Sequence, residues 1–178
     1  MKFKILIVVG KFYDGAATHL IKGSTSLLDQ YKKFETTHDW GPPSILPHFP
    51  NESEDTSLRK HAIEYKILNA PGIFEIPLLI SCNIEKYDAV IALGCVIKGE
   101  TPHFDFISSA ATNGIMDLSI KHQKPIMNGI VTCLNEQQAR ERCDPSKKNK
   151  GGAATQSLLW LLGISKDQNE RKWSASKS

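Results

Sequence analysis

The sequence lacks any apolar run of about 18 residues, which is the length that a membrane-spanning helix needs. Its opening residues, MKFKILIVVG, contain one short apolar stretch and no small-residue cleavage site, so we interpret them as a strand and not as a signal peptide. The net charge of +3 is small, and the lysines are scattered apart from the stretch SKKNKG at 146–151. A nucleic-acid-binding protein needs a concentrated basic face. We therefore expect neither a membrane nor a nucleic acid as a partner.

Several motifs of metal and cofactor chemistry are also missing. The cysteines show no C-x-x-C or C-x-x-H spacing, and they are Cys82, Cys95, Cys133 and Cys143. Cysteines scattered in this way are typical of reduced thiols in the cytosol, so we expect a cytoplasmic protein. No G-x-S-x-G, no G-x-G-x-x-G and no His, Cys and Asp cluster with metal-ligand spacing occurs. We therefore expect neither a metal site nor a nucleotide-dependent enzyme.

The apolar runs that are present indicate a parallel sheet. Three of them show no alternation of polar and apolar residues, and they cover 3–9, 87–97 and 125–134. Such runs are typical of strands that are buried on both faces. A fourth run, 61–72, alternates through Ile63, Tyr65 and Ile67, as expected at the edge of a sheet.

Helical patterns separate these runs, so the fold class that the sequence predicts is α/β. The predicted helices lie within 17–33, 74–86, 104–122, 135–142 and 151–164. Pro77 is tolerable only in a first turn, so the second of these helices should begin near Glu75. We expect one domain over residues 1–165, with a proline-rich surface insertion at about 35–57 and a polar, mobile tail at 166–178.

Unusual residues gather where the predicted strands end. In an open parallel sheet, ligands bind beyond the carboxyl ends of the strands. The residues found there, or within the last strand, are Phe12, Glu75, Lys98, His103, Asn128 and Thr132. Because four loops meet at this edge, we expect them to build one pocket.

The chemistry that these groups support is narrow. Backbone N–H groups of Gly99, Glu100 and Thr101 before a helix would seat an anion, and His103 would move a proton near neutral pH. An aromatic ring at Phe12 and a carboxylate at Glu75 suit a flat heterocycle that carries hydroxyl groups.

Each residue also has a simpler interpretation. His103 would then begin a helix and face solvent, Glu75 would favour a helix N-terminus, and Phe12 would belong to the core. Glu100 and Thr101 would cap a helix, and Arg142 and Lys150 would be solvated charges. Both interpretations stay open on spacing alone.

Five motifs taken together resemble the lumazine synthase family, which acts in riboflavin synthesis. They are VVGKFYD, APGIFEIPL, YDAVIALGCVIKGETPHFDFIS, KPIMNGIVTCLNEQQARER and NKGGAA. They occur in the family's order and at its spacing apart from the insertion, and they cover the chain from Lys4 to about Ile164.

The resemblance implies a three-layer α/β/α domain with a four-stranded parallel sheet in the flavodoxin-like order 2-1-3-4. It also implies a reaction between 5-amino-6-(D-ribitylamino)uracil and 3,4-dihydroxy-2-butanone 4-phosphate, without metal or organic cofactor. An imine forms, phosphate leaves, and the ring closes with loss of water.

Carried over by motif, the resemblance also assigns residues. Those that would bind the ribityl pyrimidine are Phe12, Ile73, Phe74, Glu75, Val96, Ile97 and Lys98, while those that would seat the phosphate are Gly99, Glu100 and Thr101. His103 would transfer the proton. Lys98 stands where the family more often has arginine, so the charge is kept but the bidentate fork is lost.

The remaining assigned residues would come from an adjacent chain, because the family's site lies between subunits. Asn128 and Lys150 would approach the pyrimidine, and Arg142 would pair with the phosphate. Family members are homo-oligomers, pentamers at least, and some close into sixty-subunit shells; riboflavin synthase is a further partner that the family implies. The family's extra strand before the first apolar run is missing here, which favours the pentamer.

Two other functions compete with this one. A flavin- or lumazine-binding protein of the same fold would use Phe12, Glu75 and the anion seat, but it needs neither His103 nor Arg142. A Cys95 nucleophile is disfavoured because that residue lies within an apolar strand, without the exposed, electropositive surroundings of a reactive thiol.

Overall fold

The computed structural model describes residues 2–33 and 62–175, with side chains placed over 3–30 and 63–162. The expected insertion at 35–57 lies outside the described residues. The strands are β1 (Lys2–Gly10), β2 (Ala62–Ala70), β3 (Ala89–Ile97) and β4 (Ile126–Cys133). The helices are α1 (Asp14–Lys33), α2 (Ile76–Asn83), the short 3-10 helix η2 (Ile84–Lys86), α3 (His103–His122), α4 (Glu136–Cys143) and α5 (Lys150–Ala175).

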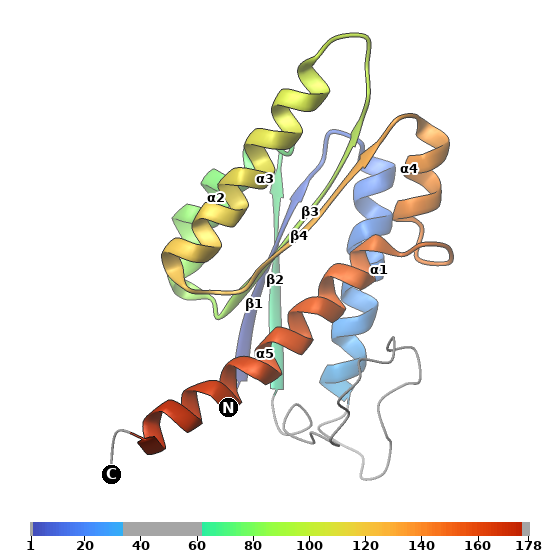
Figure 1. The fold of residues 1–178 in the computed structure, drawn as a ribbon. Helices are drawn as coiled ribbons and strands as arrows, with labels where there is room; N and C mark the ends of the chain where they lie inside the picture. The colour runs from blue at the N-terminus through green and yellow to red at the C-terminus, as the bar shows by residue number, and fades with distance from the viewer. Residues whose placement is uncertain (1, 34–61, 176–178) are drawn as a thin grey trace.

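The four strands form one parallel sheet in the order β2-β1-β3-β4. This confirms the expected α/β fold and the order 2-1-3-4. β2 lies at one edge, as its alternating pattern predicted, and β4 lies at the other. Since all the strands are parallel, their carboxyl ends meet at one end of the sheet, which we call the rim (Figure 1).

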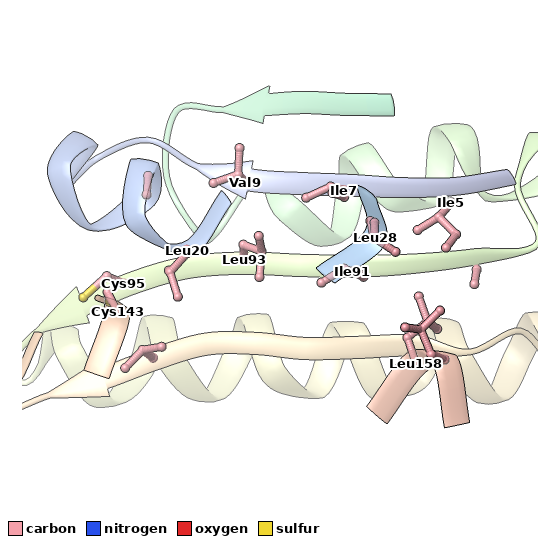
Figure 2. Packing of buried hydrophobic residues seen from close by; sticks show 14 of the residues in the cluster. Ile5, Ile7, Val9, Leu20, Leu28, Ile91, Leu93, Cys95, Cys143 and Leu158 are labelled. Carbon is pink, nitrogen blue, oxygen red and sulfur yellow. The ribbon is translucent and has the colours of Figure 1, made fainter. Parts of the chain in front are cut away.

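Helices cover both faces of the sheet (Figure 1), which gives the expected three layers. On one face Ile5, Ile7 and Val9 pack with residues of α1, α4 and α5 (Figure 2). On the other face Leu6 and Val8 pack with residues of α2 and α3. Successive side chains of a strand point to opposite faces, and full burial of each contributes about 1.5–3 kcal/mol. β1 is therefore buried on both faces, as its unbroken apolar run requires.

The close packing of α1 on α5 fixes where α5 begins. A Cβ atom on Gly151 would collide with the backbone oxygen of Leu20, so only glycine allows the two helices to approach this closely. Asn149 adopts a φ of 43°, and its side-chain oxygen accepts a hydrogen bond of 3.1 Å from the N–H of Gly152. This interaction caps α5 and sets the position of Lys150, the first residue of the helix.

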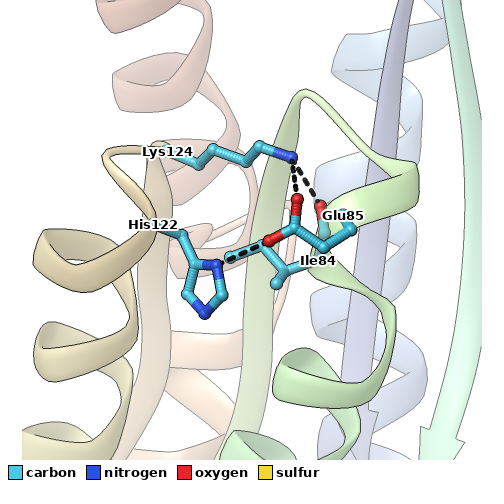
Figure 3. Close-up of polar contacts among 4 residues, drawn as sticks. All are labelled: Ile84, Glu85, His122 and Lys124. Atoms are coloured by element: carbon cyan, nitrogen blue, oxygen red, sulfur yellow. Dashed lines mark hydrogen bonds and ion pairs between the residues drawn. The ribbon is translucent and has the colours of Figure 1, made fainter.

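Three side chains hold the end of α3 at the end of the sheet opposite the rim (Figure 3). His122 Nδ1 lies 2.8 Å from Glu85 Oε1, and Lys124 Nζ donates a hydrogen bond of 2.9 Å to the carbonyl oxygen of Ile84. The hydrogen bond to His122 and the charge of Lys124 lower the pKa of Glu85. The interactions join η2, α3 and the start of β4, and so they orient α3 from its far end.

Two helices differ in extent from the sequence prediction. α2 begins after Glu75 with Pro77 in its first turn, as predicted, but it ends at Asn83 and continues as the 3-10 helix η2. α5 extends to Ala175, into the segment expected to be a polar tail. The domain limits and the mobility of that tail stay predictions. Within the residues that the structure describes, no helix is long and apolar enough to cross a membrane.

Candidate active site

The loop that follows β2 folds back over the rim. Lys11 N–H donates to the carbonyl oxygen of Ala70 at 2.9 Å, and Gly72 N–H donates to Glu75 Oε2 at 2.9 Å. Glu75 thus closes its own loop as well as preceding α2. A Cβ atom on Gly10 would lie 3.0 Å from the backbone of Gly72, so a side chain there would push the loop away from β1. The loop is therefore part of the sheet's rim.

Ile73 and Phe74 have opposite surroundings in this loop. Ile73 is buried, and its Cγ2 would lie 2.6 Å from a Cβ atom on Gly94, so the glycine makes room for it over β3. Phe74 is 61% exposed, and Phe12, which follows β1, is 76% exposed. The ring of Phe12 lies edge-on to the ring of Tyr13, with the two ring centroids 5.0 Å apart. The interpretation of Phe12 as a core residue is wrong. Two exposed aromatic rings beside the rim offer apolar surface to a flat ligand.

The turn that the sequence predicted to bind an anion follows the end of β3. Lys98 N–H makes the last ladder bond, 2.9 Å to the carbonyl oxygen of Cys133, and the turn 99–101 that follows is exposed. The N-cap of α3 is Pro102, without a capping side chain, so Glu100 and Thr101 do not cap it. Within the described ranges, the backbone N–H groups of residues 99–101 have no hydrogen-bond acceptor. Unpaired N–H groups before a 20-residue helix suit an anion.

His103 and the backbone of β3 complete this part of the rim. His103 is the first residue of α3, and its side chain is exposed. Val96 and Ile97 are the half-buried last two residues of β3, and Val96 lies opposite Thr132 on β4. The imidazole of His103 therefore belongs to a residue close in sequence to the turn 99–101, and it is accessible to solvent.

A second group of predicted residues lies elsewhere, in a hollow of about 290 Å³ beside β4. Asn128 of β4, Arg142 of α4 and Lys150 of α5 all line it. Asn128 is opposite Ala92 in the middle of β3, and it lies four residues before Thr132, which is about 13 Å at ~3.3 Å per residue. We call this space the β4 hollow. Thr132 also lines this space, so the β4 hollow runs along the edge strand from Asn128 to the rim at Thr132.

Local sequence explains how α4 presents Arg142 to the β4 hollow. Asn135 caps α4 by accepting a 2.9 Å hydrogen bond from the N–H of Gln138, and Ala139 and Cys143 anchor the helix in the core. Arg142 is half-buried, and its Nε is buried without a hydrogen-bond partner among the described residues. Arg142 and Lys150 therefore place two cationic side chains in one space.

The sequence predicted these cations but missed the small residues around them. The walls of the β4 hollow include Gly129, Ala153, Ala154 and Ser157. A Cβ atom on Gly129 would lie 3.1 Å from that of Ala154, so this wall allows little added volume. The run GGAAT at 151–155 was the available signal, because small residues at the start of a helix permit another surface to approach closely.

The structure thus sorts the predicted residues into two groups. Those at the rim are Phe12, Ile73, Phe74, Glu75, Val96, Ile97, Lys98, Gly99, Glu100, Thr101 and His103, and those in the β4 hollow are Asn128, Arg142 and Lys150. Thr132 also lines the β4 hollow, whereas the residues of the other three loops do not, so one pocket shared by all four loops stays a prediction. Among the described residues, no group of three or more His, Cys, Asp or Glu side chains is arranged to hold a metal ion.

Comparison with known proteins gives a consistent set of relatives. A profile described as 6,7-dimethyl-8-ribityllumazine synthase matches residues 51–166. A protein of Bartonella henselae with that name is 35% identical over 169 residues, which cover 93% of this chain and 90% of the relative. A protein of Nitrobacter hamburgensis with the same name is 36% identical over 168 residues, covering 90% of this chain and 85% of the relative. One of Agrobacterium fabrum, also so named, is 32% identical over 169 residues, covering 91% and 94%.

Proposed function

The chain belongs to the 6,7-dimethyl-8-ribityllumazine synthase family, and we propose that it condenses 5-amino-6-(D-ribitylamino)uracil with 3,4-dihydroxy-2-butanone 4-phosphate. It is a transferase of riboflavin biosynthesis. The observation that carries this conclusion is the match to enzymes of this name across most of their length and most of this chain. No feature of the chain favours a binding protein without catalysis.

The rim would hold one substrate and the reacting atoms. Phe12 would stack on the pyrimidine ring, since its ring is exposed beside the ends of the strands. Ile73, Phe74 and Glu75 would surround the ribityl chain, and Glu75 keeps a carboxylate oxygen beside the hydroxyl groups. The backbone of Val96 and Ile97 would run along the heterocycle, with Lys98 at its margin.

The phosphate of the second substrate would lie in the turn before α3. The N–H groups of Gly99, Glu100 and Thr101 would donate to its oxygens, and the positive end of the α3 dipole would favour its charge. The phosphate leaves during the reaction, so donors that hold the departing group also stabilise the charge that it carries away.

A neighbouring copy of the chain would complete this site with its β4 hollow. Arg142 would make a charge-assisted contact with the phosphate, and Asn128 and Lys150 would approach the pyrimidine. This arrangement gives a role to three side chains that line one hollow to which Phe12, Glu75 and His103 do not contribute. The Nε of Arg142, which is buried and without a partner in the described residues, would gain an acceptor in the assembly. We therefore propose a homo-oligomer, and a pentamer as its smallest form.

The reaction needs little from the protein beyond the alignment of the two substrates. The 5-amino group attacks the ketone and an imine forms with loss of water. A proton then leaves the carbon next to the imine while the C–O bond to phosphate breaks, which gives an enol. The enol becomes a ketone, the 6-amino nitrogen attacks its carbonyl carbon, and a second water leaves as the ring closes. Alignment of two reactive partners can lower the barrier by up to ~7–11 kcal/mol. His103 would move the proton, which typically adds ~10²–10⁴-fold.

A direct assay tests the function. The purified chain is mixed with both substrates, and lumazine formation is followed by absorbance against a reaction without protein. We expect formation well above that control. Binding of the ribityl pyrimidine without acceleration of its condensation would instead identify the alternative, a flavin- or lumazine-binding protein. Equilibrium sedimentation of the same sample tests the assembly, since a stable monomer would exclude a shared site.

The cellular setting stays part of the proposal. Cys82, Cys95, Cys133 and Cys143 are free thiols, which suits the reducing cytoplasm. Riboflavin synthase is proposed as a functional partner because it would consume the product. Co-purification of the two proteins from cells tests for a physical complex.

A further inference from the structure

Three of the cysteines lie together in the core next to Arg142. Cys95 is on β3, Cys133 is on β4, and Cys143 is the last residue of α4. All three belong to the same buried cluster, and the thiol of Cys95 is in hydrogen-bonding contact with both of the others. Figure 2 shows Cys95 and Cys143 side by side. The proposed reaction uses none of these thiols.

The register of the sheet excludes one of the three possible pairs. Cys95 is opposite Val131, and Cys133 is opposite Ile97, so the two cysteines are diagonal neighbours on one face. Diagonal Cβ atoms on adjacent strands are about 7–8 Å apart, whereas a disulfide needs ~3.5–4.5 Å. Cys143 approaches the same face from the helix layer, where no such spacing applies. Of the two pairs that remain, Cys95 and Cys143 are the one whose thiols share a hydrogen bond, so they are the pair suited to a disulfide.

We propose that Cys95 and Cys143 form an intrachain disulfide when a peroxide oxidises the protein. The thiolate of Cys143 attacks one oxygen of hydrogen peroxide, the O–O bond breaks, and Cys143 becomes a sulfenic acid. The hydroxide that leaves takes up the proton lost by Cys143, giving water. The Cys95 sulfur then attacks the sulfenic sulfur, and the released hydroxide leaves with the Cys95 proton as a second water. Two thiols are oxidised and one peroxide is reduced.

The charges around the pair assign Cys143 as the attacking group. The hydrogen bond with Cys95 and the positive charge of Arg142 lower the pKa of Cys143. The hydrogen bond with Cys143 and burial raise the pKa of Cys95, which therefore keeps its proton. A thiolate is the nucleophile in thiol oxidation, and a nearby cation is the usual cause of its formation.

A local opening of α4 gives the oxidant access. Cys143 is fully buried, but α4 has eight residues and only Ala139 and Cys143 anchor it in the core. Short elements with few buried contacts open at a small fraction of the global unfolding free energy. Such an opening exposes Cys143 while the β-sheet stays intact.

The consequence for the active site rests on the proposed function. Arg142 precedes Cys143, so a bond from Cys143 to β3 changes the last turn of α4 and the direction of the guanidinium in the β4 hollow. The oxidised enzyme should then bind the phosphorylated substrate more weakly. We expect its KM to rise roughly tenfold, as when one hydrogen bond to a charged group is lost.

The bond itself is tested on the wild-type enzyme without reference to activity. The protein is treated with hydrogen peroxide, remaining thiols are alkylated under denaturing conditions, and the digest is analysed by mass spectrometry. We expect one linked peptide that joins Cys95 to Cys143, has lost two hydrogen atoms and separates on reduction. A link from Cys133 to either Cys95 or Cys143, or sulfinic acid at Cys143 without a link, would overturn the proposal.

Matched variants separate the pair from the other thiols. Cys82→Ser and Cys133→Ser should leave the link unchanged, whereas Cys95→Ala should leave a sulfenic acid at Cys143 that dimedone traps. Kinetics before and after oxidation test the consequence, with Cys143→Ser as the variant whose KM should not respond. A link without any change in KM would overturn the effect on Arg142. Inactive reduced wild-type enzyme would instead count against the proposed function, so the two failures are distinguishable.

Discussion

Ser24 and Thr155 join the middle of α1 to the first turns of α5 through a hydrogen bond of 2.6 Å between their fully buried hydroxyl groups. Thr155 also donates to the carbonyl oxygen of Gly151 at 3.1 Å, so Ser24 is the donor of the bond between the helices. This pair stabilises the helix contact that positions Lys150. Because Ser24 donates and Thr155 accepts, replacing one residue should change the stability of the protein by a different amount than replacing the other.

Replacement of the acceptor should therefore cost more than replacement of the donor. Thr155→Val leaves the Ser24 hydroxyl buried without its partner, which costs about 1–3 kcal/mol of unfolding free energy. Ser24→Ala leaves Thr155 bonded to Gly151 and should cost less. The double variant should resemble Ser24→Ala more than the sum of both changes. Chemical denaturation measures all three, and a larger loss for Ser24→Ala than for Thr155→Val would contradict the assigned donor.

Gly151 should not accept even one added methyl group. Its Cβ atom would meet the backbone of Leu20, which cannot rotate away, so Gly151→Ala forces α1 and α5 apart. We expect a loss of about 1–3 kcal/mol or more, seen as a lower midpoint of thermal unfolding. Gly15→Ala is the matched control, because nothing lies within 4 Å of its Cβ position. That variant should change stability by less than about 1 kcal/mol.

The interactions of Glu85 predict a pH dependence of stability. The pKa of Glu85 is lowered in the folded protein from its ordinary value of 4.5, first by the hydrogen bond to His122 and then by the charge of Lys124. The folded state therefore binds its proton less readily than the unfolded state. Its contribution is complete above pH 4.5 and is lost as the pH falls through the lower, folded-state pKa.

Wild type and Glu85→Gln should thus differ in stability near neutral pH and converge in acid. Denaturant unfolding across a pH series measures the difference. Because the Glu85 carboxylate is exposed, the difference should be small and should shrink in high salt. A difference that grows as the pH falls would show that the ionised carboxylate does not stabilise the fold.

His103→Ala should slow the enzyme without abolishing catalysis. Placement of the two substrates survives the change, while the ~10²–10⁴-fold contribution of proton transfer is lost from kcat. His19→Ala is the control, since it removes an exposed imidazole from α1. Steady-state kinetics with both substrates measures the effect. A fall to the uncatalysed rate with substrate binding intact would contradict the proposed division between placement and proton transfer.

Arg142→Ala should raise the KM for the phosphorylated substrate by at least about tenfold and change the KM for the ribityl pyrimidine far less. The reason is the loss of one charge-assisted contact to phosphate. Arg140→Ala on the same helix is the control, because Arg140 is exposed and forms a 3.0 Å ion pair with Glu136. An unchanged KM in Arg142→Ala would remove that residue from the site.

Much of the rim followed from sequence pattern alone. Unbroken apolar runs identified the buried strands, and the rule that ligands bind beyond strand ends selected Phe12, Glu75 and His103. The strand order did not follow from periodicity, because several parallel orders satisfy the same pattern; it came from resemblance. Capping by Glu100 and Thr101 was an equally good interpretation until the backbone showed Pro102 at the N-cap.

Contacts between distant segments were beyond the reach of pattern. The proximity of Cys95 and Cys143 depends on how α4 packs on the sheet, and the Ser24 and Thr155 bond depends on the crossing of two helices. Neither has a local spacing that could signal it. The grouping of Arg142 with Asn128 and Lys150 likewise arises from packing beside an edge strand.

The parallel sheet separates the part of the chain that performs chemistry from the part that is free to vary. The chain leaves α1 at Lys33 and returns at Ala62, where β2 pairs with the start of β1, at the end of the sheet far from the rim. Added sequence between those points therefore leaves the spacing from Ile97 to His103 untouched. This junction is where the protein can be lengthened far from the proposed catalytic residues, and where a foreign peptide could be grafted for display on the proposed homo-oligomer.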